Sequence, residues 1–172
     1  MIFLLFIFFQ ISFAKSQKYK VGDNVEAEFT DTNGDLKLTG EGITYSFTLE
    51  YIPFNQIREK VKTIVVGSNI RGIGITLFYK LSVETVVLGK DVVIVHSNAF
   101  EGCSKLRTIT FPTKMKRIES NAFLSCHSLE SVILPKKLNV LRENAFDDCI
   151  NLRKLYIGNS LKNFTYRAFT GC

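Results

Sequence analysis

The sequence NAFEGC at residues 98–103 recurs as NAFLSC at 121–126, as NAFDDC at 144–149 and as RAFTGC at 167–172. The copies are 23 residues apart, and they contain all four cysteines of the chain. Repetition at such a spacing is typical of solenoids, in which every repeat forms one coil and buries its apolar side chains against its neighbours. We therefore expect equivalent residues to lie above one another in columns.

Two apolar clusters precede each copy and follow the same period. The first has the pattern L-x-x-I-x-L and ends in Pro or Gly, as around Leu106 and Ile109, and the second is a pair such as Met115 and Ile118. Short apolar runs bounded by Pro or Gly predict short strands. We expect these strands to form a parallel sheet with a spacing of about 4.8 Å. The columns of Leu106, Ile109 and Phe123 should form its core.

Residues 59–172 hold about five repeats, of which the first is degenerate. Its strand begins at Val61, 22 residues before the next one, and it has Leu77 where Phe is expected and Lys80 where Cys is expected. We interpret it as a terminal repeat. The Asn of each Asn-Ala-Phe is expected to cap a short helix, because Asn accepts backbone N–H hydrogen bonds at helix starts.

The combination of the strand L-x-x-I-x-L-P with the motif A-F-x-x-C resembles the BspA-like class of leucine-rich repeats, found on secreted and surface proteins of microbes. The resemblance covers residues 61–172, with four matching copies of the motif. It implies an α/β leucine-rich-repeat solenoid with a parallel β-sheet and short helices or turns. It also implies binding, because the family includes adhesins that engage host cells and extracellular matrix.

Residues 1–16 have the features of a secretory signal peptide. Residues 1–14 are almost continuously apolar, and Ser12 and Ala14 are small residues before a possible cleavage site after Ala14. The run is shorter than the roughly 20 residues that span a bilayer. We therefore expect a mature chain without an integral membrane span, while an uncleaved N-terminal anchor is the alternative.

Residues 17–58 lack the repeat and predict a small antiparallel β cap. Apolar residues alternate with acidic ones at 25–29, and residues 36–38 follow an Asn-Gly turn, which together indicate a β-hairpin. Residues 45–49 could add a third strand, and 53–60 are expected to form a turn or helix. A solenoid needs such a cap because its first repeat has no neighbour to cover its core.

The cysteines are expected to remain reduced. Four cysteines in a secreted chain would ordinarily indicate two disulfides. In a stack, however, equivalent side chains are parallel and about 4.8 Å apart, whereas a disulfide needs Cβ atoms about 3.8 Å apart. We expect four buried thiols that pack as small apolar groups.

The sequence predicts no catalytic, cofactor-binding or metal site. Asp31, Asn33 and Asp35 have the spacing that opens a calcium loop, but Leu36 and Gly42 stand where that loop needs Gly and a bidentate Glu. His96 and His127 belong to no zinc or nucleophile pattern. We therefore expect a protein that is not an enzyme and needs no cofactor.

The outward positions of the strands are the candidate binding face. One column holds mostly apolar residues, which indicates either a contact surface or simply the β-propensity of these residue types. The predicted binding residues are Val87, Thr110, Ile133 and Tyr156, with Lys154 beside them. A second outward column alternates in charge and predicts a ladder of ion pairs that fixes register: Lys62, Glu84, Arg107, Glu130 and Arg153.

The loops after the strands are rich in lysine and contribute much of the net charge of +6. Stacking would place them along one edge, the basic rim. We expect solvated lysines that keep the chain soluble, and a site for acidic glycans or anionic cell surfaces is the alternative. The rim residues are Lys90, Lys114, Lys116, Lys136, Lys137 and Lys162. Asn163 opens a possible N-glycosylation sequon, next to the inward-pointing Phe164.

These features predict a secreted or cell-surface leucine-rich-repeat protein that binds a protein or glycan on a cell surface or matrix. Nucleic acid is an improbable partner for a secreted chain. The sequence ends at Cys172 within the repeat pattern, which predicts either end-to-end self-association or a fragment of a larger product. The alternative function is a structural or truncated piece of a larger repeat surface antigen.

Overall fold

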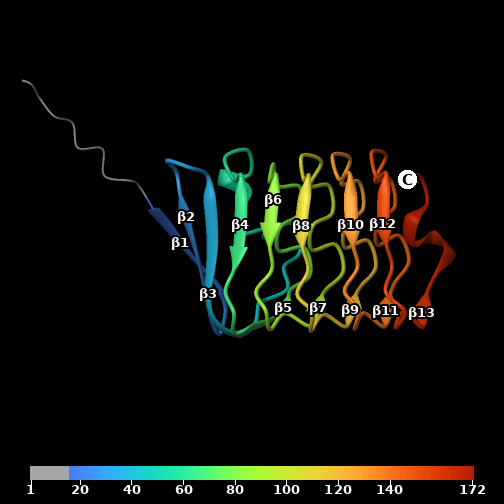
Figure 1. Cartoon of the computed structure of the whole chain (residues 1–172). Coiled ribbons are helices and arrows are strands. Elements are labelled where there is room, and N and C mark those ends of the chain that lie inside the picture. Colours follow the sequence, from blue (N-terminus) through green and yellow to red (C-terminus); the bar gives the residue numbers. More distant parts are fainter. Residues whose placement is uncertain (1–15) are drawn as a thin grey trace, which may run out of the picture.

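The computed structural model describes residues 16–172 and shows a parallel β-solenoid of about four turns with little helix (Figure 1). Successive coils stack along one axis behind an antiparallel cap. The only helical elements among the described residues are two 3-10 turns, η1 (Asn55–Ile57) and η2 (Tyr166–Phe169). The predicted leucine-rich-repeat solenoid with a β cap is therefore confirmed, with turns in place of most of the short helices.

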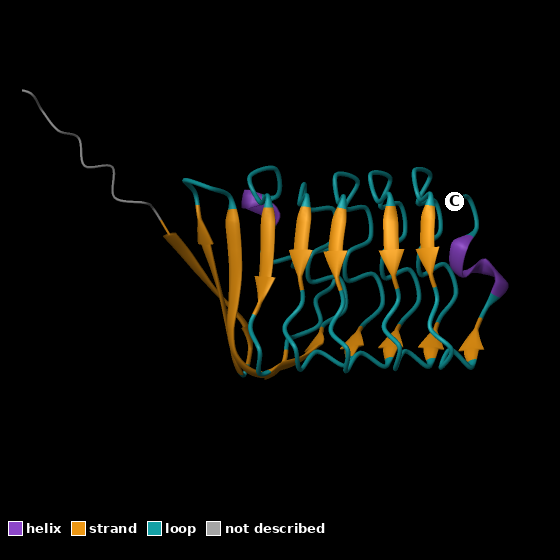
Figure 2. Cartoon of the chain, viewed as in Figure 1, coloured by secondary structure: helices purple, strands orange, loops and turns teal. Residues whose placement is uncertain are grey.

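The first strand of each coil forms the front sheet, as the repeat pattern predicts (Figure 2). Its strands are parallel and in register, so that Ile64 pairs with Val86 and Val86 with Ile109. These residues point inward, because alternate side chains of a strand face opposite sides. The front strands are β4 (Thr63–Val66), β6 (Thr85–Val87), β8 (Thr108–Thr110), β10 (Ser131–Ile133) and β12 (Lys154–Tyr156).

A second parallel sheet, the back sheet, is formed by the second apolar pair of each coil. The sequence shows the pair but predicts only one sheet, because two apolar residues three apart are too short a pattern to indicate a strand. Stacking supplies the hydrogen bonds that make these segments strands. The back strands are β5 (Ile70–Ile73), β7 (Ile94–Val95), β9 (Arg117–Ile118), β11 (Val140–Leu141) and β13 (Asn163–Phe164).

The cap consists of β1 (Ser16–Gly22), β2 (Asn24–Thr30) and β3 (Asp35–Ile43). The predicted hairpin is β2 with β3, in which Phe29 pairs with Leu36. The third strand was predicted at residues 45–49, and this is wrong: β1 takes that place by pairing with β2. Strand β3 pairs with β4 in the front sheet and with β5 in the back sheet, so that both sheets begin on one strand. The predicted signal peptide lies almost wholly outside the described residues.

A file of stacked aromatic rings runs along the core. Phe100, Phe123 and Phe146 are stacked with centroids 5.1 and 5.0 Å apart. At one end the file finishes at Phe169 of the last motif copy, and at the other it continues toward the cap as far as Phe54, which Tyr19 covers edge-on at 5.1 Å. The predicted Phe column is thus confirmed and extends by two further rings toward the cap.

The register of the first repeat differs from the prediction by one residue. Phe78, and not Leu77, stacks on Phe100 at 5.0 Å, and the buried Leu81 takes the place of Cys. Every residue of this coil therefore lies 22, and not 23, residues before its equivalent in the next coil. The missing residue falls directly after Leu81. This terminal repeat therefore keeps its core phenylalanine.

The Asn of each Asn-Ala-Phe does not cap a helix, and that prediction is wrong. These residues have positive φ angles near 60°, and turns follow them instead of helical residues. A helix cap needs extended backbone, whereas Asn tolerates the left-handed region better than most residues. The column of left-handed residues is Thr76, Asn98, Asn121 and Asn144.

The cysteines are free, and three of the four are buried as predicted. Cys172 is exposed, because no described coil covers it. Each thiol lies within hydrogen-bond distance of a Phe carbonyl in the preceding coil, as Cys126 Sγ does with Phe100 O at 3.3 Å. The thiol thus combines a small apolar volume with a weak donor for a buried carbonyl.

The front sheet has one interruption. Strands β10 and β12 pair with each other, but no ladder joins β8 to β10. At this level the ring of Phe111 packs edge-on against Phe123 at 5.7 Å, where the other coils have a smaller aliphatic residue. The predicted charge ladder is correspondingly incomplete. Within residues 16–172 it forms one ion pair, Lys62 with Glu84 at 3.6 Å.

Candidate binding face

The predicted binding residues lie on the solvent side of the front sheet. Val87 pairs in register with Thr110, and Ile133 with Tyr156, so each pair sits side by side on neighbouring strands. The exposed fractions are 40% for Val87, 67% for Ile133 and 59% for Tyr156. On β6 and β10 the central residue is buried, and alternation directs Val87 and Ile133 outward, whereas all three residues of β12 are exposed.

The interruption of the sheet divides this face into two parts. Val87 and Thr110 lie on one side, on β6 and β8, while Ile133, Lys154 and Tyr156 lie on β10 and β12. Most of the exposed apolar area belongs to the second part, where Ile133 and Tyr156 are adjacent. This part therefore has the character of a contact patch: an aromatic ring, an aliphatic side chain and one cation beside them.

All six lysines of the predicted basic rim lie in the segments that lead from front strands to back strands. These segments line the lower edge of the solenoid in Figure 1. Lys114 makes an ion pair with Asp91 at 2.5 Å. The hydrogen bond from Lys114 holds the pKa of Asp91 below its ordinary value, opposed by partial desolvation and helped by the charges of Lys90 and Arg71. One carboxylate is thus surrounded by three cations.

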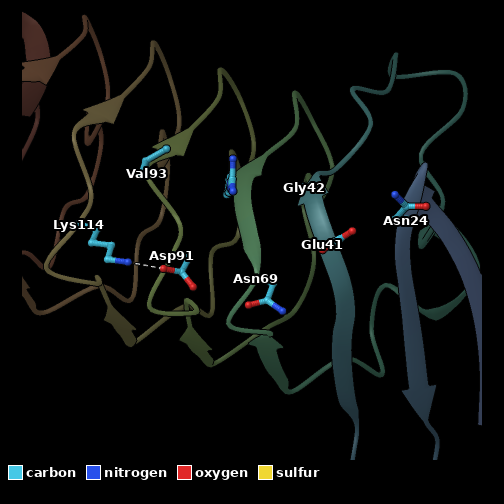
Figure 3. Close-up of a pocket in the computed structure, with 8 residues that line it drawn as sticks. Asn24, Glu41, Gly42, Asn69, Asp91, Val93 and Lys114 are labelled. Atoms are coloured by element: carbon cyan, nitrogen blue, oxygen red, sulfur yellow. Dashed lines mark hydrogen bonds and ion pairs between the residues drawn. The ribbon is translucent and has the colours of Figure 1, made fainter.

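A cavity of about 890 Å³ opens where the cap meets this edge (Figure 3). Asn24 and Glu41 project into it from the cap, and Asn69 and Asp91 from the coils. No sequence pattern indicates this cavity, because its walls come from segments up to 90 residues apart that meet where β3 passes from the front sheet to the back sheet. The lining residues are Asn24, Glu41, Gly42, Asn69, Arg71, Asp91, Val93 and Lys114.

Asn163 lies exposed on β13. Phe164, predicted to point inward, is 56% exposed, because within the described chain no further coil covers its column. Ile157 is exposed on the same coil for the same reason. The last coil therefore presents an apolar end face.

The segment from Asp31 to Asp35, which has the spacing that opens a calcium loop, forms a turn. Asn33 donates to Asp35 at 2.6 Å, and Lys60 pairs with Asp31 at 3.1 Å, so the acidic side chains are bound to protein groups. Across residues 16–172, no group of three or more His, Cys, Asp or Glu side chains could hold a metal ion. His127 contacts Asp148 at 3.0 Å, which lowers the pKa of that carboxyl, and Ser125 adds a second hydrogen bond to the carboxyl.

No helix in the described part of the chain is sufficiently long and apolar to cross a membrane.

Comparisons with known proteins agree with this architecture. The sequence pattern of the BspA type leucine rich repeat region matches residues 48–172 in six copies. The chain is similar to a leucine-rich repeat protein from Bacteroides ovatus, with 27% identity and a TM-score of 0.66 over 80% of this chain and 34% of that one. No curated protein matches significantly.

Two further solved structures share the fold. A leucine-rich repeat protein from T. pallidum is 24% identical, with a TM-score of 0.63 over 84% of this chain and 63% of that one. A leucine rich cell surface protein from Faecalibacterium prausnitzii is 21% identical, with a TM-score of 0.58 over 90% of this chain and 46% of that one. The chain thus spans from about a third to just under two thirds of these relatives. With its stacked rings and its periodic match over residues 48–172, this chain belongs to the BspA-type leucine-rich repeat family.

Proposed function

We propose that this chain is a secreted or cell-surface protein that binds a protein partner through the front sheet and performs no catalysis. The observation that carries the proposal is the exposure of Ile133 and Tyr156 side by side on β10 and β12. Side chains of this kind form the anchors of protein interfaces, because burying an aromatic ring removes a large apolar area from water. Lys154 on β12 adds a charge at the patch edge.

Localisation outside the cell is supported by three features. The N-terminal residues have the composition of a signal peptide. The family-related protein from Faecalibacterium prausnitzii is a cell surface protein. The solenoid presents a long exposed surface that serves recognition in repeat proteins generally. Adhesion to host cells or extracellular matrix is the form of binding that we propose.

The test compares two double variants of the full chain. Ile133→Asp with Tyr156→Ala removes the contact patch, while Leu49→Asp with Tyr51→Ala makes comparable changes at exposed positions outside the front strands. We expect the first variant to lose binding to intact animal cells and to solubilised extracellular matrix while its thermal melting is retained. Unchanged binding by that folded variant would refute the proposed face.

A structural or truncated piece of a larger surface protein is the second candidate. It is favoured by the chain spanning only 34% of the Bacteroides ovatus protein. In that case both double variants would behave alike, because the front face would have no partner. This candidate would be supported if the wild-type chain, like both variants, failed to bind cells and matrix.

A further inference from the structure

The cavity at the cap has the size and lining of a site for a polar ligand. Its volume of about 890 Å³ lies within the range of small-molecule sites. Its lining residues are amides, carboxylates and cations, with Val93 as the one large apolar side chain. Both asparagines and Glu41 project toward the space (Figure 3).

Several of these polar groups are exposed to solvent and have no partner within the protein. In the described chain, no side-chain hydrogen bond engages Asn24, Asn69 or Glu41, and no ion pair engages Arg71. Amides and a carboxylate are suited to hydroxyl groups, since an amide both donates and accepts and a carboxylate accepts. A guanidinium is suited to a carboxylate or sulfate, which it can bind through two parallel hydrogen bonds.

The cavity is continuous with the basic rim. Lys114 lines the cavity and belongs to the rim, and its partner Asp91 also faces Lys90 and Arg71. From there the rim continues through Lys116 and the lysines of the next two coils. With a spacing of about 4.8 Å per coil, its cations extend over roughly 15 Å. A ligand that fits both parts is long, hydroxylated and negatively charged at intervals.

We propose that the cavity and the basic rim form one binding site for an acidic polysaccharide, a chain that carries uronate carboxylates and sulfates. One acidic sugar is seated in the cavity, with its negative group on Arg71 and its hydroxyls on Asn24, Asn69 and Glu41. The rest of the chain lies across the rim lysines. This site is separate from the front face and does not depend on the function proposed for it.

The experiment measures binding of a heparin hexasaccharide to the full chain by calorimetry, at sodium chloride from about 50 to about 300 mM. Arg71→Gln should weaken binding about tenfold, the effect expected for loss of a charge-assisted pair. The matched control Lys18→Gln with Lys37→Gln removes two exposed charges away from the site and should change affinity less than twofold. Binding should weaken as salt rises.

A second variant separates sugar recognition from attraction between charges. Asn24→Ala with Asn69→Ala keeps every charge, so it should weaken heparin binding severalfold and leave binding of dextran sulfate unchanged. In the wild-type chain, heparin should shift the backbone amide resonances of Asn69 and Arg71, and not that of Tyr156 on the front face.

Three outcomes would overturn the proposal. Equal losses for Arg71→Gln and the lysine control would mean unspecific attraction to any polyanion. Tighter binding to single-stranded RNA or to phosphatidylserine vesicles than to heparin would assign the rim to another partner. An absence of resonance shifts at the cavity in the wild-type chain would exclude the site even if a variant failed to fold.

Discussion

Phe123 lies at the centre of the ring file, between Phe100 and Phe146 and against the edge of Phe111. Burial of the ring and offset stacking both favour the folded state. Phe169 occupies the equivalent position in the last coil but packs against one ring and is only partly buried. The same residue type therefore occurs in two surroundings that differ in the number of neighbouring coils.

Phe123→Ala should lower the free energy of unfolding by about 3 to 5 kcal/mol, because it leaves a cavity between two coils. Phe169→Ala should cost clearly less, since solvent already reaches its ring. Thermal and urea unfolding of both variants checks this expectation. Equal losses, or an unchanged melting curve for Phe123→Ala, would be inconsistent with a continuous core file.

The buried thiols predict a loss of stability at alkaline pH. Burial raises the pKa of Cys103 to about 12 and that of Cys149 to about 12, and it raises the pKa of Cys126 as well. An unfolded thiol has a pKa of about 8.5, so above that pH the unfolded chain releases protons that the folded chain keeps. For Cys103 and for Cys149 the free energy of unfolding should then fall by about 1.36 kcal/mol per pH unit up to about pH 12, and Cys126 should act in the same direction.

Urea unfolding between about pH 7 and about pH 11 measures this slope. Tyrosine and lysine also titrate in that range, so the control is Cys126→Ala. That variant should be less stable at every pH. Its free energy of unfolding should, however, fall less steeply with rising pH, because it lacks one of the buried thiols. Parallel curves for the two proteins would contradict the proposed protonation difference.

At this scale the sequence predicted residue roles well and backbone conformation poorly. The columns of Phe100 and Cys103 follow directly from the period. The positive φ of Asn98 did not, because the same residue type is common both at helix caps and in left-handed turns. The residue type alone does not distinguish the two, and only the hydrogen bonds of the stacked coils select one.

The bend in β3 is the element that joins the cap to both sheets. Gly40 and Gly42 have φ angles of +112° and +100°, which allow the strand to turn from the front sheet to the back sheet. A Cβ atom at Gly40 would lie 1.8 Å from Asn24 O, whereas one at Gly42 would meet no atom within 4 Å. A side chain at either position would therefore strain the backbone, but only a side chain at Gly40 would also clash with a neighbouring strand.

Gly42→Ala should destabilise the chain by about 1 to 3 kcal/mol through backbone strain alone. Gly40→Ala should cost more, because β2 must also move away from β3. Urea unfolding of the two single variants measures the difference. A Gly40→Ala variant as stable as Gly42→Ala would mean that the close approach of β2 is not required.

Because the front sheet is interrupted between β8 and β10, we expect neighbouring charges of the outward charged column to be coupled on paired strands and uncoupled across the interruption. Lys62 and Glu84 are on paired strands and form an ion pair, so a double-mutant cycle between them should give a coupling of about 0.2 to 1 kcal/mol. Arg107 and Glu130 lie across the interruption, and exchanging their charges should show no coupling. Equal coupling at both sites would indicate that the front sheet is continuous.

The front strands were predictable because each carries three apolar residues in a fixed pattern. The back strands are mostly two residues long, and β1 alternates lysines with Tyr19 and Val21 in a segment adjacent to the apolar N-terminus. Their hydrogen-bond partners come from other coils. For such short elements tertiary pairing, and not local sequence, determines the strand.

For the molecule as a whole, the apolar end face is the feature most relevant to assembly. Phe164 and Ile157 are exposed on the last described coil, whereas the equivalent residues of inner coils are buried or, in the case of Phe111, partly buried. We predict that the polypeptide of residues 1–172, studied by itself, associates end to end, because joining two such faces would remove this apolar area from water. Sedimentation velocity should show a concentration-dependent dimer that Ile157→Lys with Phe164→Glu abolishes, while Ile75→Lys with Leu49→Glu, at exposed positions elsewhere, leaves it intact. A monomer at all concentrations would refute the prediction.

The candidate sites differ in how far the sequence could predict them. The outward column with Ile133 and Tyr156 follows from alternation within strands, so its exposure was predictable. The cavity was not, because Asn24 and Lys114 meet only through the path of β3 around the corner of the solenoid. Local periodicity contains no information on where a cap rests against the coils.

Because β3 supplies the first edge of both sheets, it also affects the order in which the chain can assemble. Strands β1 to β3 precede every coil in the described chain, so the strands of this template leave the ribosome before residues 61–82 do. Each later coil then finds a completed edge on which to add, and assembly can proceed in the direction of synthesis. A chain built in this way keeps few unpaired strand edges exposed at any moment, which limits aggregation of nascent protein.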